Sequence, residues 1–214
     1  MAQADIQRQK TYGEDLSQLN KNGSGDFIRL LKVISVSKKH ITCDLRVFSL
    51  KHAPPYAAVS YCWGNGERDK VVHFSGTPVE ERESDCGHLT ISTHLYEGLQ
   101  RLSALNEFGW LWNDAICIDQ ESKEEKNDQV TRMQSIYSTA KRVYVWLGMC
   151  SGSNSLRAAS SRFFGISMTK LSRGRGFARA KILALLDRGS DVWWKRTWII
   201  QELCLCPQIG RAHV

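Results

Sequence analysis

Aromatic rings and carboxylates that could hold a nucleotide-like ligand occur in three separate segments of the chain. Trp63 ends one apolar run, Asp114 lies in a second, and Glu202 belongs to a tryptophan-rich stretch near the C-terminus. A tryptophan ring can form a flat wall for a base, and a carboxylate can bind ribose hydroxyls or stabilise developing positive charge. Further candidates for the same crevice are Ser60, Gly64, Asp119, Gln120, Arg196, Trp198 and Gln201.

The same residues also have structural interpretations, which the sequence leaves open. An aspartate near a strand end often accepts backbone hydrogen bonds from the following loop, and Asp114 fits that role equally well. Asp119 and Gln120 stand just before a helix start and could simply order the loop. Glu202 and Arg196 could form an ion pair that holds an amphipathic helix against the core.

The cysteines form no disulfide or metal-binding framework that the sequence reveals. Seven of them are scattered through apolar segments, which predicts reduced and mostly buried thiols. Cys204 and Cys206, the closest pair, have no second pair or histidine cluster at ligand spacing, so we expect no metal site. Cys117 lies between apolar neighbours, which favours burial over a role as nucleophile. No G-x-G-x-x-G motif opens a helix, so any nucleotide site would be of another kind.

Composition and charge describe a protein of ordinary globular type. A chain of 214 residues with 42% hydrophobic and 24% charged residues can bury one sizeable core. The formal net charge is +7, and residues 151–214 hold 11 of the 29 basic side chains but 3 of the 22 acidic ones. We interpret this basic third as a solvated surface and nucleic acid as an unlikely partner. The chain lacks both an apolar run of roughly 18 residues and a secretory signal, which favours a cytoplasmic location.

Apolar patterns predict the elements that must position these side chains. Strands at 27–36 and 41–50, joined by a short polar turn, predict an antiparallel hairpin at one edge of a sheet. Strands at 56–64, 109–118 and 142–148 then alternate with helices at 93–105 and 122–140. This order favours an α/β fold with a mostly parallel sheet flanked by helices, whose strand ends would bring the polar candidates to one edge.

Smaller features follow from local sequence. Thr93 is a candidate N-cap for the first helix, and Ser122 with Glu125 forms a capping box for the second. Residues 65–90 are rich in turn formers and predict a hairpin around residues 71–79. Ser60 and Tyr61 alternate along a strand, so one of them should face a crevice. Two short helices are predicted near residues 177–187 and from residue 195.

Three segments together resemble the heterokaryon incompatibility (HET) domain of filamentous fungi. They read YAAVSYCWG at 56–64, LWNDAICIDQ at 111–120 and WWKRTWIIQEL at 193–203, with KNDQVTRMQSIYSTAKRVYVWLG following the second. The resemblance covers roughly residues 56–203 and includes dense tryptophan usage. Asn113 departs from the apolar or small residue that is more usual in the family at this position. Because family members usually continue well beyond the Gln-Glu motif, the resemblance implies a C-terminally truncated chain.

The predicted organisation has three parts. Residues 1–26 are a flexible polar leader, and residues 27–208 form the HET-like domain, whose motif-bearing core is 56–203. Residues 209–214 read IGRAHV, which matches a translated sequencing adapter, so we expect this tail to be an artefact.

The resemblance also carries expectations about activity. HET domains are similar at fold level to Toll/interleukin-receptor (TIR) domains, which implies a TIR-like or flavodoxin-like three-layer fold. Some TIR domains cleave NAD with a glutamate, and by this analogy Glu202, with Asp114 second, is the candidate catalytic carboxylate and NAD the possible substrate. The function implied first is non-self recognition that leads to programmed cell death, through self-association or a protein partner. Trp193, Trp194 and Trp198 are the candidate anchors of that contact.

Overall fold

The structure, a computed structural model, describes a large part of the chain in two compact units. The described residues are 9–13, 15–22, 25–37, 40–61, 63, 67–75, 87–105, 109–146 and 163–167. The first unit comprises residues 1–56 and 63–133, and the second comprises residues 57–62 and 134–214. Each unit is considered by itself below.

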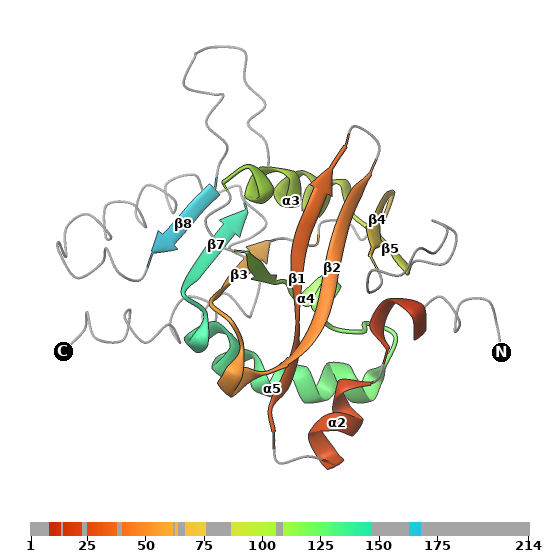
Figure 1. Cartoon of the computed structure of the whole chain (residues 1–214), viewed down its shortest axis with the longest axis vertical. Coiled ribbons are helices and arrows are strands. Elements are labelled where there is room, and N and C mark those ends of the chain that lie inside the picture. The colour runs from red at the N-terminus through yellow and green to blue at the C-terminus, as the bar shows by residue number, and fades with distance from the viewer. Residues whose placement is uncertain are drawn as a thin grey trace, which may run out of the picture. The chain divides into compact units, whose positions relative to one another are not determined.

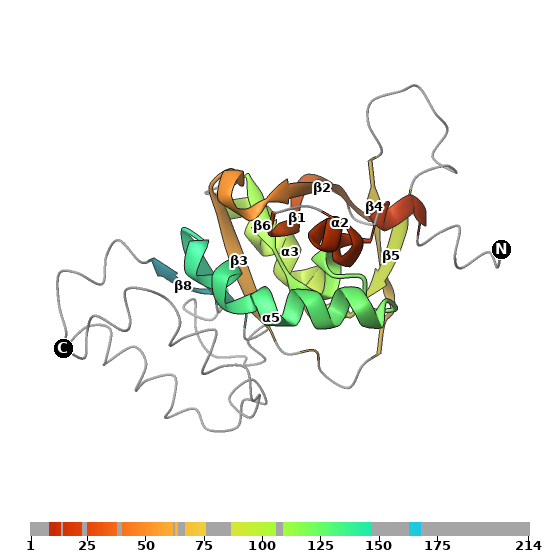
Figure 2. The same cartoon turned by 90° about the horizontal axis from the view of Figure 1, so that it is seen from below.

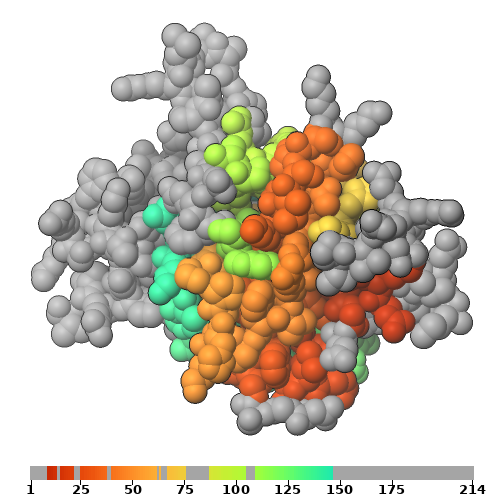
Figure 3. All heavy atoms as spheres, viewed as in Figure 1, coloured from red at the N-terminus to blue at the C-terminus, as the bar shows by residue number. Residues whose placement is uncertain are grey.

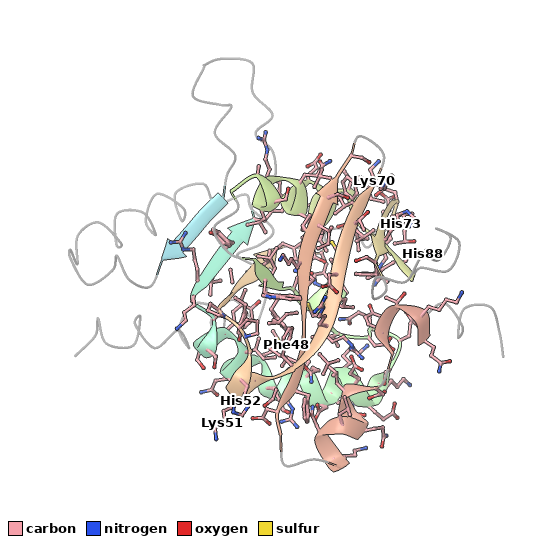
Figure 4. All side chains as sticks on the ribbon, viewed as in Figure 1. Phe48, Lys51, His52, Lys70, His73 and His88 are labelled. Carbon is pink, nitrogen blue, oxygen red and sulfur yellow. The ribbon has the colours of Figure 1, made fainter. Side chains whose placement is uncertain are left out.

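Five strands of the first unit form a mixed sheet. In chain order they are β1 (Phe27–Val36), β2 (Ile41–Ser49), β4 (Lys70–Phe74), β5 (His88–Ile91) and β6 (Trp110–Trp112), arranged as β5-β4-β2-β1-β6. β1 and β2 form the long antiparallel hairpin at the centre of Figure 1. β4 runs parallel to β2, while β5 runs antiparallel to β4 and places His88 opposite His73, as Figure 4 shows.

Helices cover one face of this sheet. They are α2 (Leu16–Asn22), α3 (Thr93–Leu105), α4 (Asp114–Cys117) and α5 (Lys123–Thr139), and a 3-10 turn, η1 (Leu50–His52), follows β2. Figure 2 shows α2 and α5 on the same side of β1 and β2. The apolar stripe of α3 is buried through Leu95, Leu99 and Leu102, as the spacing predicts. Residues of α5 from 134 onward belong to the second unit.

The second unit contains a parallel and an antiparallel strand pair. β3 (Tyr56–Tyr61) lies parallel to β7 (Arg142–Trp146), and β8 (Phe163–Ser167) runs antiparallel to β7. All six residues of β3 are buried, which fits a central strand with both faces covered. The predicted parallel crossover from residue 56 to the strand after helix 122–140 is therefore present.

The α/β class is confirmed, but the expectation of a mostly parallel, TIR-like sheet is wrong. Within the two units, four strand pairings are antiparallel (β1–β2, β1–β6, β4–β5, β7–β8) and two are parallel (β2–β4, β3–β7). The hairpin at 27–50 is also not at an edge, because β4 pairs with β2 and β6 pairs with β1. The alternation of strands and helices suggested simple crossovers, and it missed that β6 runs back against β1.

Three local predictions also change. The strand expected at 109–118 stops at Trp112, and the chain turns into α4 at Asp114. The hairpin expected around residues 71–79 is instead formed by β4 with β5. The hydroxyl of Ser92, not that of Thr93, caps α3, since it accepts a hydrogen bond from the Leu95 amide at 3.2 Å.

Part of the segment predicted as a flexible leader packs into the first unit. Residues 9–12 form a helical turn, and Leu16 in α2 is fully buried. Thr11 donates its hydroxyl to the carbonyl of His88 at 3.2 Å, which ties the segment to β5. A Cβ at Gly87 would lie 2.7 Å from Thr11 Cα, so only glycine allows this close approach. The helices predicted near 177–187 and from 195, and the tail 209–214, lie outside the described residues.

None of the described helices is long and apolar enough to cross a bilayer.

Candidate functional site

Two of the predicted site residues come together in the first unit. The indole Nε1 of Trp63 donates a hydrogen bond to Oδ2 of Asp114 at 3.1 Å, across 51 residues of chain. Asn113 is extended, with φ −142° and ψ 128°, and the chain then enters α4 at Asp114. This change of direction places the carboxylate at the end of β6, where the half-buried Trp63 ring meets it.

A third predicted residue fixes the backbone of the same turn. The side-chain amide of Gln120 donates to the carbonyl oxygen of Asp114 at 2.8 Å. The second carboxylate oxygen of Asp114 accepts the Ala115 amide at 2.9 Å. Both carboxylate oxygens of Asp114 are therefore bound by protein donors, which fits the structural interpretation of this residue.

Asp119 orders the loop between α4 and α5. Its side chain is buried, and its Oδ1 accepts the Glu121 amide at 3.1 Å, while its carbonyl accepts the Ser122 amide at 3.2 Å. Its own amide donates to Oε1 of Glu125 at 2.7 Å. These bonds match the alternative in which Asp119 arranges the turn before the helix.

The remaining predicted residues lie in the second unit or outside the described residues. Ser60 lies on β3 in the second unit, and both Ser60 and Tyr61 are buried, so neither presents the open face that strand alternation predicted. The other candidates, Gly64, Arg196, Trp198, Gln201 and Glu202, lie outside the described residues.

A buried ion pair that the sequence analysis missed lies beside this turn. Arg29 of β1 and Glu125 of α5 have side chains that are 1% and 0% exposed, and they form a two-pronged pair in which Nη2 lies 3.1 Å from Oε2. A planar guanidinium that meets a carboxylate with two donors gives a strong and directional contact. An arginine within the apolar run FIRLL was the available signal.

Backbone groups complete the environment of this pair. Glu125 also accepts the amides of Leu16, at 3.0 Å, and Asp119. Arg29 donates to the carbonyl oxygens of Tyr12, at 3.2 Å, and Cys117, at 3.4 Å. Since a buried charge is costly unless it is fully paired, these contacts explain how two charges are accommodated in the core. We call Arg29, Glu125 and their backbone partners the buried hub.

The capping box at the start of α5 is half formed as a result. The Ser122 hydroxyl accepts the Glu125 amide at 3.1 Å, as the box requires. The Glu125 carboxylate, however, accepts hydrogen bonds from Arg29, Leu16 and Asp119 rather than from the Ser122 amide. The helix start was predicted from this residue pair, whereas the second use of Glu125 was not.

Comparison with known proteins now identifies the family. The model of the family described as "Heterokaryon incompatibility protein (HET)" matches residues 56–202. The chain belongs to the HET family. It is 28% identical over 222 residues to heterokaryon incompatibility protein 6, OR allele, of Neurospora crassa, an alignment that covers 84% of this chain. The chain spans about a third of that relative, 32% of its length. No solved structure matches.

The HET match divides the buried hub. Glu125, Asp119 and Cys117 lie inside the matched range of 56–202, whereas Arg29 and the contacts from Tyr12 and Leu16 lie before it. Residues 9–31 therefore supply core contacts to residues 117–125, which lie inside the HET match. The folded first unit extends N-terminal to the HET match.

Titratable groups around the buried hub are shifted by burial and by their partners. Burial, and then the charge of Asp119, raise the pKa of Tyr12 well above its usual range. Burial raises the pKa of Asp15, but hydrogen bonds from Ser17 and Ser122 outweigh it and leave this pKa below the ordinary value. Asp15 is thus held as a carboxylate at the edge of the buried hub.

Cys117 has the environment of a packing residue. It is fully buried, and burial raises the pKa of its thiol to about 12. Its Sγ accepts the Asn113 amide at 3.4 Å. A thiolate nucleophile needs a lowered pKa and access to substrate, so the predicted burial of Cys117 is confirmed. Among the described residues, no group of three or more His, Cys, Asp or Glu is arranged to hold a metal ion.

Proposed function

We propose that this chain is a signalling module of heterokaryon incompatibility. It recognises non-self and promotes growth arrest or programmed cell death through a protein contact, either with itself or with a partner. The observation that carries this proposal is the HET match over residues 56–202. Similarity to the Neurospora crassa protein, which is named as a heterokaryon incompatibility protein, supports the same role. A cytoplasmic location is part of the proposal and can be checked by fractionation.

The described site is compatible with a module that binds rather than transforms a ligand. The carboxylate of Asp114 is held by Trp63 and Ala115, and Asp119 is engaged by its own loop. Carboxylates in such settings position the backbone and leave little capacity to act on an incoming group. A signalling role needs instead a stable body with a surface for a partner.

Inducible expression in a filamentous fungus tests the proposed function. The whole chain should slow colony growth and increase uptake of a viability dye, and fusion to a chemically induced dimerisation domain should strengthen both effects if self-association is the trigger. Glu125→Gln, which breaks the buried hub, should abolish them, whereas the exposed neighbour variant Glu124→Gln should not. Normal growth with full accumulation of the folded protein would overturn the proposal.

NAD hydrolysis is a second candidate function. One observation favours it: the Trp63 indole is hydrogen-bonded to the Asp114 carboxylate, so an aromatic ring that could stack on a base lies next to an acidic group. NAD and nicotinamide measured in the same induced cells separate the two functions. Growth arrest at constant NAD supports the interaction module, while nicotinamide release that is lost in Asp114→Asn or Glu202→Gln supports the enzyme.

A further inference from the structure

Four side chains from three strands form a cationic and aromatic cluster on the sheet of the first unit. They are Lys32 of β1, Arg46 and Phe48 of β2, and Trp110 of β6, and we call them the Trp110 surface. Tryptophan and arginine are the residue types most enriched where binding energy concentrates in protein interfaces. Their occurrence together on an open sheet face therefore needs an explanation.

Strand register places all four on the same face. Lys32 lies opposite Asp44 in the hairpin, and side chains at alternate positions of β2 share that face, which adds Arg46 and Phe48. Leu31 points to the other face and pairs with Leu111, so Trp110, next in β6, lies on the face of Lys32. The pleat alone thus predicts the cluster.

Contacts between the side chains confirm this placement. The Phe48 and Trp110 rings meet edge to face, with centroids 5.0 Å apart. The guanidinium carbon of Arg46 lies 5.9 Å from the Trp110 centroid, within the range of a cation–π contact. Lys32 extends along the same edge, since its Cε lies 3.9 Å from the Cβ position of Gly109.

On this face Lys32 and Arg46 are exposed and the Phe48 and Trp110 rings are half-buried, while Ile28 and Leu30 beneath them are fully buried. The opposite face carries Arg29 and Leu31 and packs beneath α2 and α5, whereas Figures 1 and 2 show no described helix over β1 and β2 on the Trp110 side. Figure 3 shows the orange atoms of β2 at the surface beside yellow-green atoms of the α3–β6 region. The Arg46 side chain is 58% exposed.

The charges of the Trp110 surface determine the chemistry of its partner. Arg46 pairs with Asp44 at 2.7 Å, while Lys32 has no ion-pair partner among the described residues. The surface therefore presents one uncompensated cation beside an aromatic pair. A protein segment with a carboxylate next to an apolar or aromatic side chain complements both features.

Two other occupants fit this pattern less well. Nucleic acid gains affinity from many phosphate contacts, and one uncompensated cation provides few of them. A second copy bound through the same patch would bring Lys32 and Arg46 against their own equivalents, which places like charges together.

We propose that the Trp110 surface binds an acidic, aromatic-containing segment of a partner protein. This inference rests on the proposed function, because it names the surface and the partner chemistry of the interaction module. The indole and phenyl rings receive the apolar side chain. Lys32 receives a carboxylate, and Arg46 contributes the guanidinium donors that its bond to Asp44 leaves available.

Fluorescence anisotropy with labelled peptides tests the inference on the whole chain. The probes are short peptides that alternate glutamate with phenylalanine, the same peptides with lysine for glutamate, and an oligo-uridine RNA. The acidic aromatic peptide should bind best, and added salt should weaken it. Arg46→Glu, a change at an exposed position, should raise its Kd by about tenfold or more. Lys51→Glu, the same charge reversal at an exposed lysine of η1 at the lower end of β2 in Figure 4, is the matched control and should leave Kd unchanged.

Each other result overturns the inference. Equal binding of the lysine peptide, binding of RNA alone, an unchanged Kd for Arg46→Glu, or light scattering that shows a dimer lost in Arg46→Glu would each exclude an acidic partner segment. The cell assay separates this inference from the proposed function. If the Arg46→Glu variant no longer binds the peptide but still arrests growth, the proposed function stands and the role of the Trp110 surface in it is excluded. If the wild-type chain binds the peptide but does not arrest growth, the surface stands and the proposed function is excluded.

Discussion

Two arginines of the first unit lie over aromatic rings, yet their surroundings are opposite. Arg29 Cζ is 4.9 Å from the centroid of the Tyr12 ring, and the arginine side chain is 1% exposed. Arg46 Cζ is 5.9 Å from the centroid of Trp110, and this side chain is 58% exposed. Each arginine also pairs with one carboxylate. The same chemical arrangement therefore occurs once inside the core and once at the surface.

The difference in burial gives the two arrangements different roles. In the buried hub, no water can replace a lost partner, so every donor and acceptor must be satisfied by the protein and loss of one is costly. At the Trp110 surface, water can take the place of a partner, so the ion pair contributes little to stability. The buried hub holds the N-terminal segment, β1 and α5 together, and the Trp110 surface is available for recognition.

The largest effect is expected when the buried hub loses one charge. Glu125→Gln keeps the side-chain shape but leaves Arg29 buried without a counter-charge. Because the Leu16 and Asp119 amides donate to different carboxylate oxygens, the new amide group also turns its donors toward one of these two backbone donors. We expect the free energy of unfolding, measured by urea titration, to fall by about 3–5 kcal/mol. Glu124→Gln, an exposed control one residue earlier, should change it by less than about 0.5 kcal/mol. A similar small loss for both variants would contradict the assigned role of the buried hub.

Local elements of this molecule could be predicted, because their signals lie within a few residues. The hairpin residues 27–36 and 41–49 are two apolar runs joined by a short polar turn, and α5 follows from Ser122 together with an apolar stripe that buries Met133 and Ile136. Trp63 and Asp114 were predicted to lie at one edge of a sheet together with Glu202; the first two are hydrogen-bonded, and Glu202 lies outside the described residues. Strand ends in one sheet tend to bring such residues together.

Long-range pairing could not be predicted from the same signals. Arg29 in an apolar strand is compatible with an exposed edge or with a buried partner, and its partner Glu125 lies 96 residues away. Sheet direction was wrong for a similar reason, because β6 has three residues and its antiparallel pairing with β1 rests on Leu31 and Leu111. Neither pairing leaves a local pattern in the sequence.

A smaller and pH-dependent effect is expected at the edge of the buried hub. The pKa of Asp15 in the folded protein lies below its unfolded value, because hydrogen bonds from Ser17 and Ser122 outweigh burial. Such a group contributes stability above its unfolded pKa, about 3.9, and that contribution is lost as pH falls through the folded pKa. Asp15→Asn should therefore be less stable than the wild type at neutral pH, and the difference should shrink below about pH 4. Urea titrations across the acidic range measure it, and a difference that grows as pH falls would contradict the sign.

The smallest effect on stability is expected at the Trp110 surface. Arg46→Ala removes an ion pair in which Arg46 is 58% and Asp44 14% exposed, together with a cation–π contact with Trp110, and water takes the place of the lost guanidinium. We expect the free energy of unfolding to change by less than about 1 kcal/mol, while Arg29→Ala, which removes the same contact types inside the core, should cost about 3 kcal/mol or more. Since the two variants delete the same side chain, their difference measures what burial adds to one arrangement. An Arg46→Ala loss as large as that of Arg29→Ala would mean that Arg46 is part of the structural framework, and the assignment of the Trp110 surface to recognition would then fail.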